Sequence, residues 1–160
     1  MDASALLNSA RAQGLMIATA ESCTGGMVSA AITDIPGSSD VFDRGFVTYT
    51  NAAKRQMLGV ADATLAAHGA VSEQVAAEMA AGALAQSDAR IAVSITGIAG
   101  PGGSDHKPEG RVCFGVASPS MTRTETCDFG ALGRDKVRRV ATEHALALLQ
   151  QAVDSYAPDN

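Results

Sequence analysis

The fold is organised around the stretch Thr19-Ala20-Glu21-Ser22-Cys23-Thr24-Gly25-Gly26. The apolar run at 15–18 precedes it and predicts a strand, whereas the run at 27–32 follows it and predicts the start of a helix. Such a turn places small polar groups at the positive end of a helix, where unpaired backbone N–H groups can hold an anion or an oxyanion. Two interpretations of Ser22 therefore stay open at this point, a nucleophile and a capping residue.

Strands and helices alternate over the rest of the chain. The run 90–96 is apolar almost throughout and indicates a central parallel strand that is buried on both faces. The short link 118–121 favours an antiparallel hairpin between the last two strands. We expect one α/β domain over residues 1–160, a three-layer α/β/α sandwich with a mostly parallel sheet and one reversed strand. The other predicted strands are 42–50, 110–117 and 122–129, and the predicted helices are 5–13, 52–58, 62–68, 72–86 and 133–153.

Polar residues at the ends of helices predict their caps. Asn51 is expected to cap the helix that follows it, and Ser72 is expected to cap the long alanine-rich helix. If Ser22 is the nucleophile, Thr24 becomes the better cap candidate at the central turn. Gly59 is expected to close the first of these helices, because glycine adopts the left-handed conformation without strain.

Composition and charge exclude several classes of function. The chain has 160 residues, of which 46% are hydrophobic, and its formal net charge is −5. Because no basic stripe is present, we expect no binding to nucleic acid or to anionic membranes. No basic region precedes an apolar run near Met1, so we expect no signal peptide, and no apolar run is long enough to cross a bilayer. The three dispersed cysteines form no CxxC pair. We therefore expect a cytoplasmic protein without a cofactor or a catalytic metal.

Three predicted strand ends carry small, polar or reactive residues. The first is the central turn with Ser22, the second runs from Tyr49 to Lys54, and the third runs from Thr96 into a glycine-rich loop that ends at Ser104. Ligands of parallel α/β sheets bind at the carboxyl ends of the strands. If the strands are neighbours, the three groups meet in one cleft.

A nucleophilic serine needs a base, and Lys54 is the better candidate. It is predicted in the first turn of a short helix, where the positive helix end and burial in a cleft would both lower the pKa of the amine. The alternative is a solvated surface lysine. None of the histidines, His68, His106 and His144, is predicted at a strand end beside Ser22.

The remaining candidates each have a structural alternative. Tyr49 is a proton donor or a packing residue, and Thr96 positions the reacting groups or only favours the strand. The backbone N–H groups near Thr24, Gly25, Gly26 and Gly97 are expected to hold an oxyanion, although these glycines also suit turns.

A phosphate has two candidate sites. One is the loop with Gly100 and Gly102, which lacks the Lys-Ser/Thr ending of a Walker motif. The other is the start of the last helix, with Arg134 and Arg138, where the alternative is a solvated basic face.

Several long motifs in the same order make the chain resemble the CinA C-terminal domain family over about residues 6–153. The matching segments are 19–26, 45–54, 68–72, 94–103, 107–110 and 134–138. The resemblance implies an α/β/α fold with a mixed five-stranded sheet and a stand-alone form of the domain. Family habit and the alanine-rich helices suggest a homodimer.

The resemblance also implies a reaction. Enzymatic members of the family are nicotinamide-nucleotide amidohydrolases, which convert nicotinamide mononucleotide to nicotinate mononucleotide and ammonia in pyridine-nucleotide salvage. Ser22 matches the family's nucleophile, Lys54 matches its base, and Tyr49 and Thr96 match accessory residues. A nucleotide-phosphate sensor without catalysis and an amidase for another small amide remain alternative functions.

Overall fold

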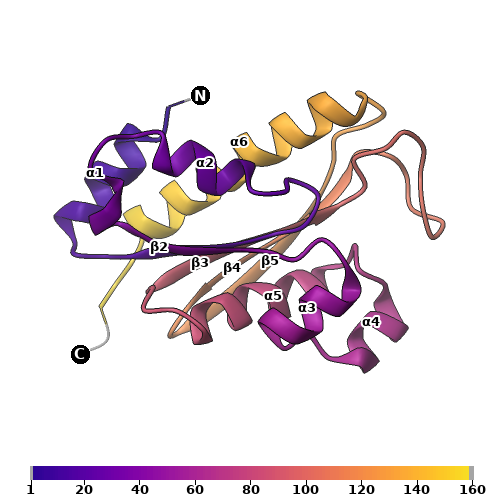
Figure 1. Cartoon of the computed structure of the whole chain (residues 1–160), viewed down its shortest axis with the longest axis horizontal. Helices are drawn as coiled ribbons and strands as arrows, with labels where there is room; N and C mark the ends of the chain where they lie inside the picture. Colours follow the sequence, from indigo (N-terminus) through magenta and orange to yellow (C-terminus); the bar gives the residue numbers. More distant parts are fainter. Residues whose placement is uncertain (1, 159–160) are drawn as a thin grey trace.

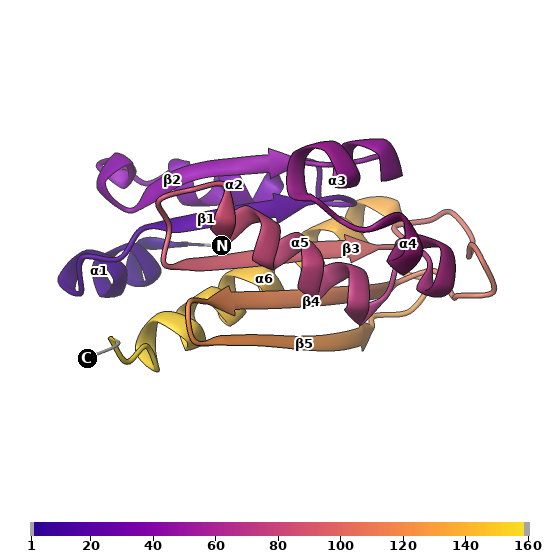
Figure 2. The same cartoon turned by 90° about the horizontal axis from the view of Figure 1, so that it is seen from below.

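The computed structural model describes residues 2–158, which contain a single five-stranded sheet with the strand order β2-β1-β3-β4-β5 (Figures 1 and 2). Residues 1, 159 and 160 of the predicted domain lie outside this range. β1 pairs in parallel with β2 and β3, whereas β4 runs antiparallel to both β3 and β5. Four strands thus share one direction and one is reversed, so the predicted sheet is confirmed. The strands are β1 (Ile17–Glu21), β2 (Phe42–Val47), β3 (Ile91–Gly97), β4 (Arg111–Ser118) and β5 (Met121–Asp128).

Helices cover both faces of the sheet and make the three layers (Figure 1). One face is covered by α1 (Ser4–Ala12), α2 (Met27–Thr33) and α6 (Arg134–Asp154), and the other by α3 (Asn51–Leu58), α4 (Asp62–His68) and α5 (Glu73–Ala85). Each face has its own apolar core, and the strands β1 and β3 contribute to both. Within residues 2–158, no helix combines the length and the apolar character that a membrane span requires.

The central turn is shorter than the sequence predicts. Thr19 to Glu21 continue β1, so only the residues from Ser22 to Gly26 form the link to α2. β2 ends at Val47, before the predicted end at residue 50. The backbone N–H of Thr48 still donates to the carbonyl of Glu21 at 2.8 Å, which keeps the two strand ends side by side.

Gly59 closes α3 as predicted, but two of the three predicted amino-terminal caps are wrong. Thr50, not Asn51, caps α3, because its side chain accepts a hydrogen bond from the N–H of Ala53 at 3.0 Å. The residue at the cap of α2 is Gly26, and the hydroxyl of Thr24 has no hydrogen-bond partner among the described residues. Ser72 caps α5 as predicted.

Gly82 lets α5 approach the end of α3, and this contact predicts an unusual mutational effect. Alanine normally stabilises a helix interior by about 1 kcal/mol relative to glycine. A Cβ at Gly82 would overlap with the backbone carbonyl of Leu58, however. We expect Gly82→Ala to destabilise the protein by about 1–3 kcal/mol, as overpacking does.

Thermal unfolding measures this effect, and Ala81→Gly on the exposed side of α5 is the matched control. The control should show the ordinary preference for alanine. A Gly82→Ala protein with an unchanged or raised melting temperature would contradict the prediction.

Candidate active site

A cavity of about 340 Å³ opens at the carboxyl ends of β1, β2 and β3. The strand order β2-β1-β3 places the three polar strand ends next to one another, as the cleft hypothesis requires. Most of the predicted site residues line this cavity: Ser22, Tyr49, Lys54, Thr96, Gly97, Gly100, Gly102 and Arg134. Thr24, Gly25, Gly26 and Arg138 are not among the lining residues.

Ser22 and Lys54 are in direct contact. Lys54 Nζ lies 2.9 Å from Ser22 Oγ, and the two side chains come from segments 32 residues apart. Only 1% of Lys54 and 8% of Ser22 is exposed, so both groups are shielded from bulk water. Lys54 stands in the first turn of α3, whose cap at Thr50 sets where the helix begins.

The surroundings of Lys54 favour its neutral form. Burial lowers the pKa of the amine to about 8. Besides Ser22, Nζ contacts two acceptors, the backbone carbonyls of Thr48 at 2.8 Å and Tyr49 at 3.3 Å. A neutral amine has two hydrogens and one lone pair. With both hydrogens on the carbonyls, the lone pair is left for the hydroxyl proton of Ser22.

The lowered pKa predicts how the reactivity of Ser22 depends on pH. A general base acts in its deprotonated form, so with Lys54 as the base of Ser22 we expect a serine-directed sulfonyl fluoride to label Ser22 about tenfold faster per pH unit below about 8, with a plateau above it. Mass spectrometry of the labelled peptide measures this rate. A labelling rate that does not change across this range would show that Lys54 is not the base.

The amino end of α2 is occupied by a side chain of the protein itself. The carboxylate of Glu21 is fully buried and accepts hydrogen bonds from the N–H groups of Val28 at 2.9 Å and Ser29 at 3.0 Å, and from Ser29 Oγ at 2.7 Å. Ser29 Oγ also lies 2.7 Å from Thr19 Oγ1. Gly45 on β2 leaves room for these hydroxyls, since a Cβ there would come within 2.6 Å of both.

Some backbone donors of the central turn remain available. The N–H of Gly25 donates to the carbonyl of Ser22 at 3.0 Å, whereas those of Cys23, Thr24 and Gly26 donate to no acceptor within residues 2–158. Of these three residues only Cys23 lines the cavity. Its N–H directly follows Ser22 in the chain, which is a common place for an oxyanion donor.

Arg138 binds the backbone carbonyls of the turn, on the side away from the cavity. Its Nε donates to the carbonyl of Cys23 at 3.0 Å, and its Nη2 lies 3.4 Å from the carbonyl of Thr24. A Cβ at Gly25 would come within 3.2 Å of Nη2, so the arginine packs closely on this backbone. The structure thus places Arg138 on the carbonyl side of the turn and outside the cavity lining.

Arg134 links two walls of the cavity. Its Nη2 donates to the hydroxyl of Tyr49 at 2.5 Å, and its Nη1 donates to the carbonyl of Gly100 at 2.8 Å. Tyr49 is 54% exposed, so its ring lies at the mouth of the cavity. The residue thus contributes to the site twice, with its backbone carbonyl on Lys54 and its phenol on Arg134.

The loop at residues 97–104, which we call the glycine-rich wall of the cavity, is held in place by the carboxylate of Glu109. Glu109 accepts hydrogen bonds from the N–H groups of Gly102 at 2.7 Å and Gly133 at 3.2 Å. A Cβ at Gly100 would come within 2.6 Å of the same carboxylate. The wall and the start of α6 are therefore tied together.

At the end of β3, the hydroxyl of Thr96 donates to the carbonyl of Ala70 at 2.8 Å and fixes the segment before α5. Next to it, a Cβ at Gly97 would come within 2.7 Å of the side chain of Val112, so this glycine allows close packing against β4. Both residues shape the cavity wall.

Two charged residues of the lining, Asp105 and Lys107, were not singled out as site residues from the sequence. Lys107 Nζ donates to the backbone carbonyls of His68 at 2.7 Å and Val71 at 2.5 Å. Lys107 begins the segment 107–110, which is one of the segments that resemble the CinA C-terminal domain family. That match was the signal in the sequence from which Lys107 could have been found. Apart from Lys54, the lining carries two cationic side chains, Lys107 and Arg134, and one carboxylate, Asp105, and this balance favours an anionic ligand.

Cys23 lies beside Ser22, but its thiol is poorly suited to act as a nucleophile. Its side chain is buried, and burial raises the pKa of the thiol to about 11. The thiolate is the reactive form of cysteine, so this thiol is inert near neutral pH.

Comparisons with known proteins agree with the geometry. The CinA C-terminal domain family matches residues 2–153. The nicotinamide-nucleotide amidohydrolase PncC of Escherichia coli K12 is 57% identical over 145 residues, which cover 88% of this chain and 86% of the relative. The crystal structure of a competence/damage inducible protein from Agrobacterium tumefaciens has a TM-score of 0.87 and 45% identity, with 97% of this chain and 99% of that chain covered. A CinA superfamily protein from Klebsiella pneumoniae has a TM-score of 0.92 and 35% identity, with 96% of both chains covered.

Proposed function

The chain belongs to the CinA C-terminal domain family, and we propose that it is a nicotinamide-nucleotide amidohydrolase. It converts nicotinamide mononucleotide and water to nicotinate mononucleotide and ammonia, a reaction of pyridine-nucleotide salvage. The observation that carries the proposal is the buried contact of 2.9 Å between Lys54 Nζ and Ser22 Oγ. A serine that contacts a lysine of lowered pKa is an activated nucleophile.

The proposed reaction has two halves. Neutral Lys54 takes the proton of Ser22 while Oγ attacks the carboxamide carbon of the nicotinamide ring. The N–H of Cys23, which lines the cavity and has no acceptor among the described residues, supports the oxyanion. Protonated Lys54 then gives its proton to the departing ammonia. In the second half, Lys54 takes a proton from water, the resulting hydroxide attacks the acyl-enzyme, and the proton returns to Ser22 as nicotinate mononucleotide leaves.

We assign the phosphate of the substrate to the cationic side of the cavity. Arg134 and Lys107 both line it, together with Gly100 and Gly102 of the glycine-rich wall. The guanidinium of Arg134 is held by Tyr49 and by a carbonyl, which fixes its position before a ligand binds. Arg138 supports the turn with Ser22 in this proposal and does not contact the phosphate.

A direct assay tests the proposal. Purified protein is incubated with nicotinamide mononucleotide in the presence of EDTA, and ammonia release is followed with glutamate dehydrogenase. We expect rapid release from the nucleotide and strongly reduced release from free nicotinamide, because the phosphate site is then left without its ligand. Equal rates would indicate an amidase for small amides. Bound nucleotide without ammonia release would indicate a sensor.

The predicted homodimer and cytoplasmic location belong to the same proposal. Large apolar side chains are exposed along the segment from β2 to α3, among them Val47, Tyr49 and Met57. Burial of such side chains is a usual driving force for association. Light scattering after size exclusion should give twice the mass of one chain.

A further inference from the structure

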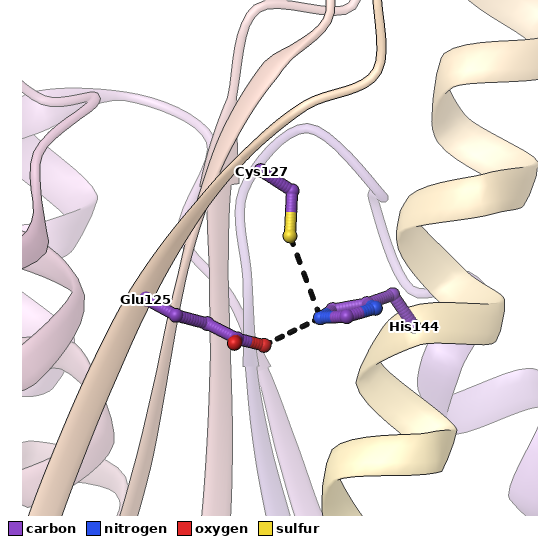
Figure 3. A group of neighbouring side chains, drawn as sticks. All are labelled: Glu125, Cys127 and His144. Carbon is purple, nitrogen blue, oxygen red and sulfur yellow. Dashed lines mark hydrogen bonds and ion pairs between the residues drawn. The ribbon is translucent and has the colours of Figure 1, made fainter.

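A second cluster of reactive side chains lies between β5 and α6, outside the lining of the active-site cavity. Glu125 and Cys127 alternate along β5 and point to the same side, where His144 approaches from α6 (Figure 3). The alternate residues of the strand face the opposite way, since Thr124 and Thr126 donate hydrogen bonds to Glu73 on α5. The strand therefore delivers its carboxylate and its thiol to one place.

Glu125 and Cys127 both contact the same ring nitrogen of His144. His144 Nε2 lies 2.5 Å from Glu125 Oε1 and 3.5 Å from Cys127 Sγ, and all three donor atoms lie within 4.8 Å of one another. In Figure 3 the ring nitrogen stands between the carboxylate and the sulfur. A tetrahedral zinc ion with bonds of about 2.0–2.3 Å separates its ligands by roughly 3.3–3.7 Å. The sulfur–nitrogen pair already has this spacing, and the carboxylate needs to withdraw by less than about 1 Å.

We propose that Glu125, Cys127 and His144 form a binding site for one divalent metal ion of the zinc class. Imidazole nitrogen, thiolate sulfur and carboxylate oxygen are the three kinds of ligand that zinc takes from proteins. A thiolate and a carboxylate together balance the two charges of the ion. Magnesium and calcium prefer oxygen ligands and are poor competitors for this set. On binding, the thiol proton of Cys127 passes to solvent as the sulfur–metal bond forms, and water completes the fourth position.

The setting of the cluster suits a bound ion. The ring of His144 packs on Phe114, with 4.6 Å between the ring centroids, and on Phe129 at 6.0 Å, which fixes its orientation. The side chains of His144 and Glu125 are 31% and 44% exposed, so an ion has a path from solvent. Arg123 is two residues before Glu125 on β5 and lines an adjacent pocket with it, and its charge opposes the ion. We therefore expect a weaker affinity than that of a closed structural zinc site.

Such an ion would join β5, an edge strand of the sheet, to α6, a helix of the layer that also holds α1 and α2. β5 ends the sheet on one side, and α6 packs across β3 and β4. A metal bond between β5 and α6 exists only in the folded chain, so binding must stabilise the fold. This role is structural and is independent of the reaction at Ser22.

Titration with zinc chloride and cobalt chloride tests the proposal on the full chain after removal of any affinity tag. We expect one zinc ion per chain by calorimetry, a raised melting temperature with zinc, and a thiolate-to-cobalt charge-transfer band in the near ultraviolet. Cys127→Ser should abolish the band and weaken zinc binding by more than the roughly 10–100-fold that loss of an outer partner costs. Glu125→Gln should weaken it as well, and the side chain of this residue is only partly buried and lies outside the apolar core.

Matched controls separate the site from incidental thiol or carboxylate binding. Cys113→Ser changes a thiol on the neighbouring strand β4 that contacts Thr126 on the α5 side, and Glu143→Gln changes an exposed acid next to His144. Both should bind zinc as the unchanged protein does. The proposal is overturned if the unchanged protein binds no zinc, or if Cys127→Ser and Glu125→Gln bind it as tightly as the controls.

Discussion

Ser22→Ala should lower ammonia release from nicotinamide mononucleotide by at least about 1,000-fold, because the variant cannot form the acyl-enzyme. The change removes one hydroxyl whose hydrogen bond in the structure is to Lys54. The helix cap at the turn is unaffected, since Glu21 and not Ser22 satisfies the amino end of α2. We therefore expect a folded protein that still binds the nucleotide.

Steady-state ammonia assays measure the loss, and calorimetry measures the retained binding. Ser120→Ala, in the hairpin turn between β4 and β5, is the matched control and should keep full activity. Turnover of Ser22→Ala within tenfold of the unchanged protein would exclude Ser22 as the nucleophile.

Lys54→Met should lower turnover by about 10²–10⁴-fold, the usual contribution of a general base. Lys54→Arg should show a similar loss of turnover, because a guanidinium stays protonated near neutral pH and cannot accept the proton of Ser22. Ammonia assays on the three proteins measure this effect. Activity of Lys54→Arg close to that of the unchanged protein would show that only the positive charge matters.

The same substitution should change how stability depends on pH. Burial lowers the pKa of Lys54 from 10.5 to about 8, so between these values the unfolded chain holds a proton that the folded chain has released. Stability from this group therefore rises with pH, by about 2 kcal/mol between about pH 7.5 and 9.5. Urea unfolding should show this rise as a difference between the unchanged protein and Lys54→Met. Taking the difference removes the opposite trend of Cys23, whose raised pKa lowers stability as pH rises above 9.

The sequence was sufficient for the sheet and for placing Ser22 and Lys54 in one cleft, whereas their catalytic roles stay a prediction. Apolar runs marked β1 and β3, and polar residues at the strand ends pointed to Ser22 and Lys54. The prediction worked because parallel strands bring their carboxyl ends to one edge, so local patterns became neighbours once the strand order was known.

Other parts of the site depend on contacts that no local pattern contains. Glu21 reaches over a turn to cap α2, and Glu109 joins the glycine-rich wall to the residue before α6, 24 positions later. The exchange of Asn51 for Thr50 as the cap of α3 reflects a shift of one residue in the helix start, which residue preference alone does not resolve. Arg138 was predicted from its position at a helix start, but its direction is set by packing against the turn.

The residues in contact at the site are far apart in the sequence, so the activity of the site reports whether the whole chain has folded. The pairs Lys54–Ser22, Arg134–Tyr49 and Arg138–Cys23 are separated by 32, 85 and 115 residues along the chain. Contacts of such sequence separation form only when the intervening loops have closed, and these are the slow steps of folding. Enzymatic turnover should therefore recover only with the last stage of refolding, after the helices have formed, and should be lost with the first cooperative loosening of the sheet edge.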